Sequence, residues 1–203
     1  MLSATFTGVH GEGKIQLFED LATALRRKGI RVHVAEIEGG YSSIQMRAES
    51  LGLSIEEETN DETQYYLAVA SIESDFRNRH QALLENAQVL LSARSVADVL
   101  AYTLYLNDGQ EKQLIINLLR HHIAAYPPDI SFNPAPLPTN SKPKTTEDFR
   151  LRINKIFENV WNETKMNIVK VPVFASDDMD LNQMERVKFC SKMLMTKLGL
   201  KLT

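Results

Sequence analysis

The stretch TFTGVHGEGKIQL, residues 5–17, has the residue types and the spacing of a loop that binds phosphate. Gly8 is followed by four residues and then by Gly13 and Lys14. Glycines let the backbone bend closely around an anion, and the N-terminus of the following helix adds a positive potential. The pattern therefore predicts that Lys14 binds the phosphates of a nucleotide. The alternative is a glycine-rich turn that happens to carry a lysine.

Two residues of this loop, Ile15 and Glu12, depart from the usual pattern, and Gln16 does not replace the missing ligand. The position after Lys14 is normally Ser or Thr, whose hydroxyl binds Mg²⁺, but here it is Ile15. Gln16 has a carbonyl oxygen but faces another side of the helix, and Glu12 places a negative charge inside an anion site. We therefore expect nucleotide binding with weakened metal positioning. The residues expected to line the nucleotide are Gly8, His10, Gly11, Glu12, Gly13, Lys14, Ile15 and Gln16.

The elements that must position this loop alternate between strands and helices. We expect strands at 1–9, 30–38, 87–93, 129–133 and 166–174, and helices at 13–29, 41–52, 61–87, 95–106, 110–125, 147–164 and 180–198. This alternation predicts an α/β fold with a mostly parallel sheet and helices on both faces. Right-handed crossovers bring the carboxyl ends of the strands to one edge of the sheet, where ligands bind.

Charged side chains follow two other predicted strands at this edge. Glu36 and Glu38 end the second strand on the same face, and Glu38 lies nearer the ligand edge. Arg94 follows the third strand at the start of a helix. The helix dipole disfavours a cation there, which favours a role in binding phosphate through the planar guanidinium group. The alternatives are exposed carboxylates at a strand end and a surface arginine.

A polar, basic segment follows the fourth predicted strand. The chain runs into prolines and then reads TNSKPKTTEDFR, so we expect a flexible, lid-like loop at about 134–147. Lys142, Lys144 and Arg150 are the candidates for stabilising charge on a transferring phosphoryl group. The alternative is a solvated basic loop. No spacing of Cys and His suggests a zinc site.

The loop and this layout resemble the P-loop nucleoside and nucleotide kinases. The similarity is greatest to small ATPase/kinase proteins of phage and bacterial genomes that open with a GVHGTGKTT-like stretch. The segments that carry it, in chain order, are GVHGEGK, VHVAEIE, LGLSIEEETNDETQYYLAVASIESD, VLLSARSVADVLAYTLY and TTEDFRLRINKIF. They span nearly the whole chain. The resemblance implies a three-layer P-loop NTPase fold with a mostly parallel, five-stranded sheet, in one kinase-like domain over residues 1–203.

The resemblance also implies roles for the candidate residues. Glu38, or Glu36 as second choice, is the base or a metal-shell residue beside the acceptor hydroxyl, and Arg94 binds phosphate. The third strand of these kinases normally ends in Asp-Arg-Ser, but Ala93 stands here in place of the aspartate. Ile15 and Ala93 thus stand at two positions whose usual residues help to bind Mg²⁺ in these kinases. ATP is the implied cofactor, and the use of Mg²⁺ stays open.

Two functions follow, with the kinase slightly ahead. The first is an ATP-dependent kinase that acts on a nucleoside, a nucleotide or a modified pyrimidine, including one within DNA. The second is a catalytically impaired pseudokinase with a degenerate phosphate loop, which serves as a nucleotide-binding scaffold or regulatory partner. An ATPase or GTPase motor or switch ranks third, because AQVLLSA lacks a terminal aspartate. The acceptor pocket is expected along 41–75, with Gln64, Tyr65 and Tyr66 as candidates.

Length and composition limit the number of domains, the classes of partner and the location that we expect for the protein. A length of 203 residues suits one domain, and a net charge of −3 gives no overall basic field for nucleic acid. The lone Cys190 allows no intramolecular disulfide and is expected to be a buried thiol on a helix. No run approaches the roughly 20 apolar residues of a membrane span, and no signal peptide is expected. The expected location is the cytoplasm, with a homodimer or a partner protein left open.

Overall fold

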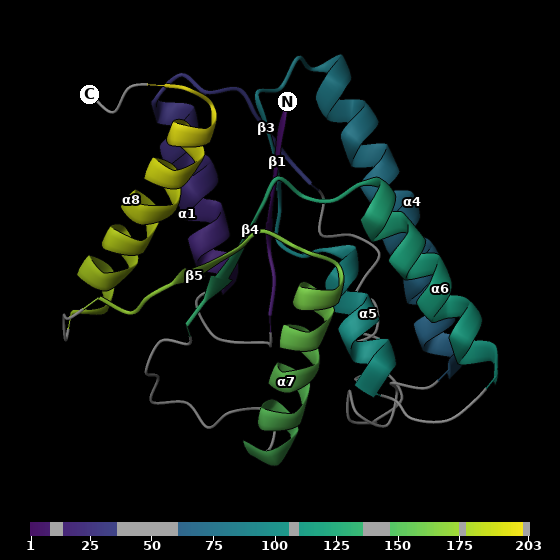
Figure 1. Ribbon diagram of the computed structural model, residues 1–203. Coiled ribbons are helices and arrows are strands. Elements are labelled where there is room, and N and C mark those ends of the chain that lie inside the picture. The colour runs from purple at the N-terminus through teal and green to yellow at the C-terminus, as the bar shows by residue number, and fades with distance from the viewer. Residues whose placement is uncertain (9–13, 36–60, 106–109, 136–146, 175–177, 201–203) are drawn as a thin grey trace, which may run out of the picture.

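The structure is a computed structural model that describes residues 1–8, 14–35, 61–105, 110–135, 147–174 and 178–200. Strands alternate with helices along the chain, as the sequence predicts (Figure 1). The elements in chain order are β1 (Leu2–Phe6), α1 (Lys14–Arg27), β2 (Val32–Val34), α4 (Asp61–Leu84), β3 (Val89–Ser92), α5 (Val96–Tyr105), α6 (Gln110–Ala125), β4 (Ile130–Pro134), α7 (Glu147–Glu163), β5 (Ile168–Val171) and α8 (Met179–Lys197). None of the described helices is both long and apolar enough to cross a membrane.

The strands form one parallel sheet in the order β2-β3-β1-β4-β5. Ala4 in the middle of β1 lies opposite Leu91 of β3 on one side and Ile130 of β4 on the other. The predicted five-stranded sheet is therefore confirmed. Because β1 is central, the segment that follows it begins between the carboxyl ends of β3 and β4. Ligands bind at this kind of position in open α/β sheets.

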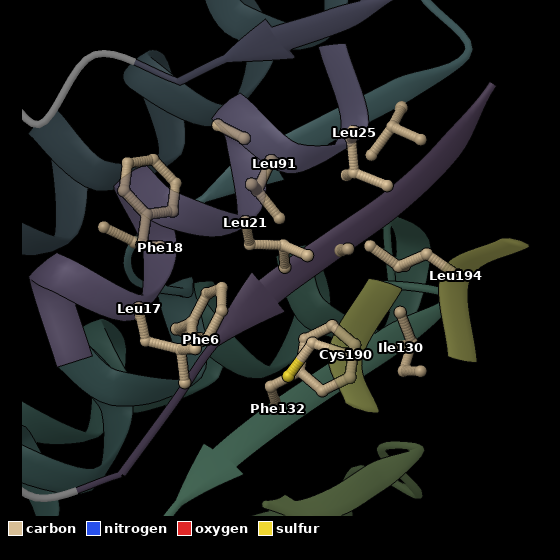
Figure 2. Close-up of a cluster of buried hydrophobic side chains, with 14 of the residues drawn as sticks. Phe6, Leu17, Phe18, Leu21, Leu25, Leu91, Ile130, Phe132, Cys190 and Leu194 are labelled. Carbon is tan, nitrogen blue, oxygen red and sulfur yellow. The ribbon is translucent and has the colours of Figure 1, made fainter. Parts of the chain in front are cut away.

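Helices α1 and α8 cover one face of the sheet (Figure 1). Leu17, Leu21 and Leu25 are spaced four residues apart, so they form a single stripe that packs on the sheet. Figure 2 shows this core, in which Phe6 and Phe132 of neighbouring strands meet with ring centroids 5.5 Å apart. Cys190 of α8 is buried in the same core, as predicted.

Helices α4, α5, α6 and α7 lie on the other side of the sheet, with α5 packed against the other three. Leu100 of α5 is fully buried there, and Tyr102 meets Phe157 of α7 edge to face with centroids 5.8 Å apart. This packing holds two elements of the later site in place. They are the first turn of α5 and the segment of α7 that carries Trp161.

Two of the described helices end at non-glycine residues with left-handed backbone. The helix predicted over 61–87 ends at Leu84, because Asn86 adopts a φ of 53° and Ala87 N–H then bonds to the carbonyl of Ala82. Lys165 plays the same part after α7, with a φ of 53°. Strand β2 is shorter than the predicted 30–38, and the predicted helix at 41–52 lies outside the described residues.

Lys165→Gly is expected to raise the free energy of unfolding by about 0.5–1 kcal/mol, because a side chain in the left-handed region is strained and glycine is not. Lys155→Gly, on the exposed side of α7, is the matched control and should lower it by about 1 kcal/mol. Urea denaturation followed by circular dichroism measures both changes. Equal losses in the two variants would contradict the capping role of Lys165.

Candidate functional site

Gly8 is the first residue of the site that the fold itself requires to be glycine. It follows β1 after one residue, Thr7, and its φ of 111° is a conformation that residues with a side chain rarely adopt. A Cβ at this position would lie 2.6 Å from Oδ1 of Asn133, which comes from the neighbouring strand β4. The backbone angle therefore strains any side chain at position 8, and the side-chain amide of Asn133 would also have to shift to make room for it.

Lys14 begins α1, and its side chain reaches back to Gly8. It is only 8% exposed, and its Nζ donates a hydrogen bond of 2.6 Å to the carbonyl oxygen of Gly8. This bond joins the last described residue before the loop to the first one after it. The loop residues 9–13 lie outside the described residues. An ammonium group is therefore buried at the N-terminus of a helix, where the helix itself adds positive potential.

Asp98 of α5 ties the start of the loop to the helices, and the sequence analysis did not select it. It is 2% exposed. Its Oδ1 accepts hydrogen bonds from Thr7 Oγ1 at 2.6 Å and from Gly8 N at 3.2 Å, and its Oδ2 accepts one from Ser95 N at 3.0 Å. A carboxylate at the third helical position that bonds back to the capping residue is half of a capping box. The spacing of Ser95 and Asp98 before an apolar run was the available signal.

Trp161 of α7 completes this network. Its Nε1 donates a hydrogen bond of 3.2 Å to Thr7 Oγ1, which in turn donates to Asp98. The Thr7 hydroxyl therefore has a fixed orientation between α7 and α5. Trp161 is the only tryptophan of the chain, so its fluorescence reports directly on the start of the loop.

The charges around Gly8 shift the pKa of Lys14. Burial, which penalises the charged form, lowers it from 10.5 to about 8. The nearby carboxylate of Asp98 opposes this effect and raises it, and the cation of Arg94 lowers it further. Lys14 is therefore still a cation at neutral pH. The structure thus brings together three residues predicted to bind phosphate, Gly8, Lys14 and Arg94, and adds the carboxylate of Asp98.

The two residues after Lys14 add no metal ligand. Ile15 is 54% exposed, and Gln16 Nε2 donates to Asp20 Oδ1 at 2.9 Å along the surface of α1. Gln16 thus faces another side of the helix, as predicted. In the part of the chain that the structure describes, no group of three or more His, Cys, Asp or Glu side chains could hold a metal ion.

Most of the other predicted site residues cannot be placed. His10, Gly11, Glu12, Gly13, Glu36, Glu38, Lys142 and Lys144 lie outside the described residues, as does the lid-like segment from 136 to 146. Arg150 lies half-buried in α7, about 16 Å along the helix axis from Trp161. It is therefore separate from the network around Thr7. Ala93 is buried just after β3, where these kinases usually have an aspartate.

Asp98→Asn is expected to lower the free energy of unfolding by about 2–3 kcal/mol, because one amide oxygen cannot accept all three buried hydrogen bonds. Asp148→Asn is the control. Its carboxylate is exposed and pairs with Arg152 on the surface of α7, so the cost should stay below about 1 kcal/mol. Denaturation followed by Trp161 fluorescence measures both. A loss no larger than that of the control would show that the network does not support the fold.

Lys14→Met is expected to stabilise the protein at neutral pH by about 1–3 kcal/mol, because it removes a buried charge whose pKa is depressed. The unfolded chain keeps this proton up to a pKa of 10.5, whereas the folded chain releases it near 8. Wild-type stability should therefore gain a contribution that grows as the pH rises between these values, and Lys14→Met should lack it. Lys155→Met is the exposed control. If Lys14→Met unfolds more easily than the wild type, the buried ammonium of Lys14 does not lower the free energy of unfolding, and the prediction is wrong.

Comparisons with known proteins agree with this geometry. No protein-family model and no curated protein sequence matches the chain. Two solved structures of NadR protein, one in complex with NAD and AMP-PNP and one with NR, match it with TM-scores of 0.69 at 14% identity. They cover 100% of this chain, which spans about half of theirs, 51% and 52%.

A thymidylate kinase from Ehrlichia chaffeensis matches with a TM-score of 0.58 at 18% identity, over 93% of this chain and 98% of its own. Identities this low show the fold alone. The resemblance to P-loop nucleotide kinases, predicted from the sequence, is therefore confirmed at the level of architecture: the chain has the three-layer α/β fold of these kinases.

Proposed function

We propose that this chain is a nucleotide-binding protein of the P-loop kinase type that transfers the γ-phosphoryl group of ATP to a nucleoside, a nucleotide or a modified pyrimidine. The observation that carries the proposal is the buried ammonium of Lys14 at the start of α1, next to Gly8 and Arg94. A buried cation lowers stability unless an anion compensates for the lost hydration. The phosphates of ATP are that anion.

Binding replaces one hydrogen bond by stronger ones. Lys14 releases the carbonyl oxygen of Gly8 and bonds to phosphate oxygens instead, so a neutral acceptor gives way to a charged one. Backbone N–H groups at the start of α1 and the guanidinium of Arg94 add further donors. Lys142, Lys144 and Arg150 are the proposed lid cations that add positive charge around the transferring group.

In the transfer step, the acceptor oxygen forms a bond to the γ-phosphorus and the bond to the β–γ bridging oxygen breaks, so ADP leaves. Positioned cations at the site stabilise the charge that is spread over the transferring group. The proton of the acceptor hydroxyl goes to a carboxylate, for which Glu38 is the first candidate and Glu36 the second. The proposed acceptor is either a free molecule or part of DNA, and its proposed pocket lies along residues 41–75.

The second candidate is a pseudokinase that binds nucleotide as a scaffold or regulatory partner. It is favoured by the loss of metal-handling groups at Ile15 and Ala93. Asp98 does not replace them, because its two oxygens already accept three hydrogen bonds from the protein. Mg²⁺ would then have to be held by ATP and by residues outside the described part of the chain. ATP is the proposed ligand of both the kinase and the pseudokinase.

Titration with ATP, followed through Trp161 fluorescence, tests nucleotide binding. We expect saturable binding that Lys14→Met weakens by about 100-fold, since charged hydrogen bonds are lost, while Lys155→Met leaves it unchanged. Affinity should also fall as the pH rises above about 8, because Lys14 then loses its proton. Equal affinity of the wild type and Lys14→Met would overturn the proposed site.

The two candidates are separated by incubation with γ-labelled ATP, Mg²⁺ and a pool of nucleosides, nucleotides and hydroxymethylpyrimidine DNA. Label transfer that Lys14→Met abolishes supports the kinase. Tight ATP binding whose affinity is the same with and without Mg²⁺, without transfer or hydrolysis, supports the pseudokinase.

A further inference from the structure

Arg186 of α8 is buried, and no carboxylate of the described residues pairs with it. It is 0% exposed, and its Nη2 donates a hydrogen bond of 2.6 Å to the carbonyl oxygen of Ala135. Its other two nitrogens, Nε and Nη1, are buried without a hydrogen-bond partner. Arg79 of α4 shows the usual arrangement, because it is less buried and its Nε bonds to Asp75 at 2.7 Å. Arg186 therefore carries a buried charge that no described ion pair balances.

The neighbours of Arg186 on the same side of α8 supply no negative charge. Asn182, one turn before it, is neutral, and its side-chain amide bonds through both ends to the backbone of Phe174. Cys190 lies one turn after it, and burial raises the pKa of its thiol to about 12, so the thiol is uncharged at neutral pH. Burial lowers the pKa of Arg186, but a guanidinium keeps its proton in proteins. The charge of Arg186 thus remains unbalanced on this helix.

A buried, unbalanced cation is unfavourable for the fold. A water molecule satisfies N–H donors but does not neutralise the charge, and an unpaired buried charge costs more than a neutral polar group. A bound anion removes this cost, since it supplies both the acceptor atoms and the opposite charge. The planar guanidinium presents its N–H donors in forks that match the oxygens of a carboxylate or a phosphate group. Arg186 is therefore suited to an oxyanion.

Arg186 also lies at the edge of the sheet where ligands bind. Ala135 follows β4 directly, and its N–H bonds to the carbonyl of Val171 in β5, so it is held at the carboxyl edge. Helix α8 covers the same face of the sheet as α1 (Figure 1). The hydrogen bonds of Thr7 instead run to α5 and α7 on the other side. The surroundings of Arg186 are thus separate from the network around Gly8.

We propose that Arg186 binds a small oxyanion, which carries a carboxylate or a phosphate group, between α8 and the carboxyl end of β4. The N–H groups of Arg186 that lack a partner donate hydrogen bonds to this anion, while Nη2 keeps its bond to Ala135. Because Arg186 has no exposed surface, the anion is small and enters through a local opening between α8 and the sheet. The site goes beyond the proposed kinase function and does not depend on it.

The Nε–H signal of Arg186 tests whether an anion binds. A ¹H–¹⁵N NMR titration of the full chain, at neutral pH and constant ionic strength, follows this signal, which Arg186→Lys assigns by removing it. We expect phosphate or acetate to shift the signal until the shift saturates, because the N–H then donates to a charged oxygen. Lys14→Met should show the same shift, which excludes phosphate at the nucleotide site as its cause. The anion that binds more tightly identifies the group as a phosphate or a carboxylate.

Equilibrium dialysis with labelled phosphate and labelled acetate assigns the binding to Arg186. In the Lys14→Met chain, Arg186→Met should weaken binding of the preferred anion by about 100-fold, because charged hydrogen bonds are lost. Arg77→Met is the matched control, since Arg77 is exposed on α4, and it should leave the binding unchanged. Circular dichroism verifies that the variants are folded.

The proposal is wrong if neither anion moves the Nε–H signal of Arg186 in the wild-type chain. It is also wrong if Arg186→Met binds the anion as tightly as Arg77→Met does. Because the NMR titration uses the wild-type chain, it decides the question even where Arg186→Met does not fold.

Discussion

The carboxylate of Asp98 is the contact on which the candidate site depends. It accepts hydrogen bonds from Thr7, from the backbone of Gly8 and from the first turn of its own helix, and it raises the pKa of Lys14. The end of β1, the start of the phosphate loop and α5 therefore share one buried acceptor. Through the Thr7 hydroxyl, Trp161 of α7 joins the same unit. The loop thus begins from a rigid frame, which keeps its first donors in place before a ligand arrives.

The site also shows a conflict between stability and binding. Gly8 and Asp98 stabilise the local fold, because each satisfies a backbone or side-chain requirement of its neighbours. Lys14 does the opposite, since its buried charge favours the unfolded chain at neutral pH. A buried, unfavourable cation at the N-terminus of a helix is consistent with the proposed phosphate site. The burial and the charge of Lys14 do not depend on which residues fill the other positions of the loop.

The sequence predicted the sheet, most helix boundaries and the position of Lys14, because hydrophobic periodicity and glycine spacing are local signals. It did not identify Asp98 or Trp161, whose bonds to Thr7 bridge 91 and 154 positions of the chain. It also placed the end of α4 too late, since nothing in the periodicity shows that Asn86 turns left-handed. The acceptor-pocket candidates Tyr65 and Tyr66 lie on the exposed side of α4, which the periodicity alone does not show.

The close approach of Gly8 to Asn133 has a consequence for how such a motif decays. Substitution at position 8 is costly, because any side chain there strains the backbone and displaces the side-chain amide of Asn133. Position 15 is open, since Ile15 is exposed and a hydroxyl can be lost there without a folding penalty. Without selection for catalysis, we expect the glycine to be retained because the fold requires it. The lysine would be replaced early, because its buried charge destabilises the fold. The presence of an unfavourable buried lysine at position 14 is therefore more informative about function than the glycine at position 8.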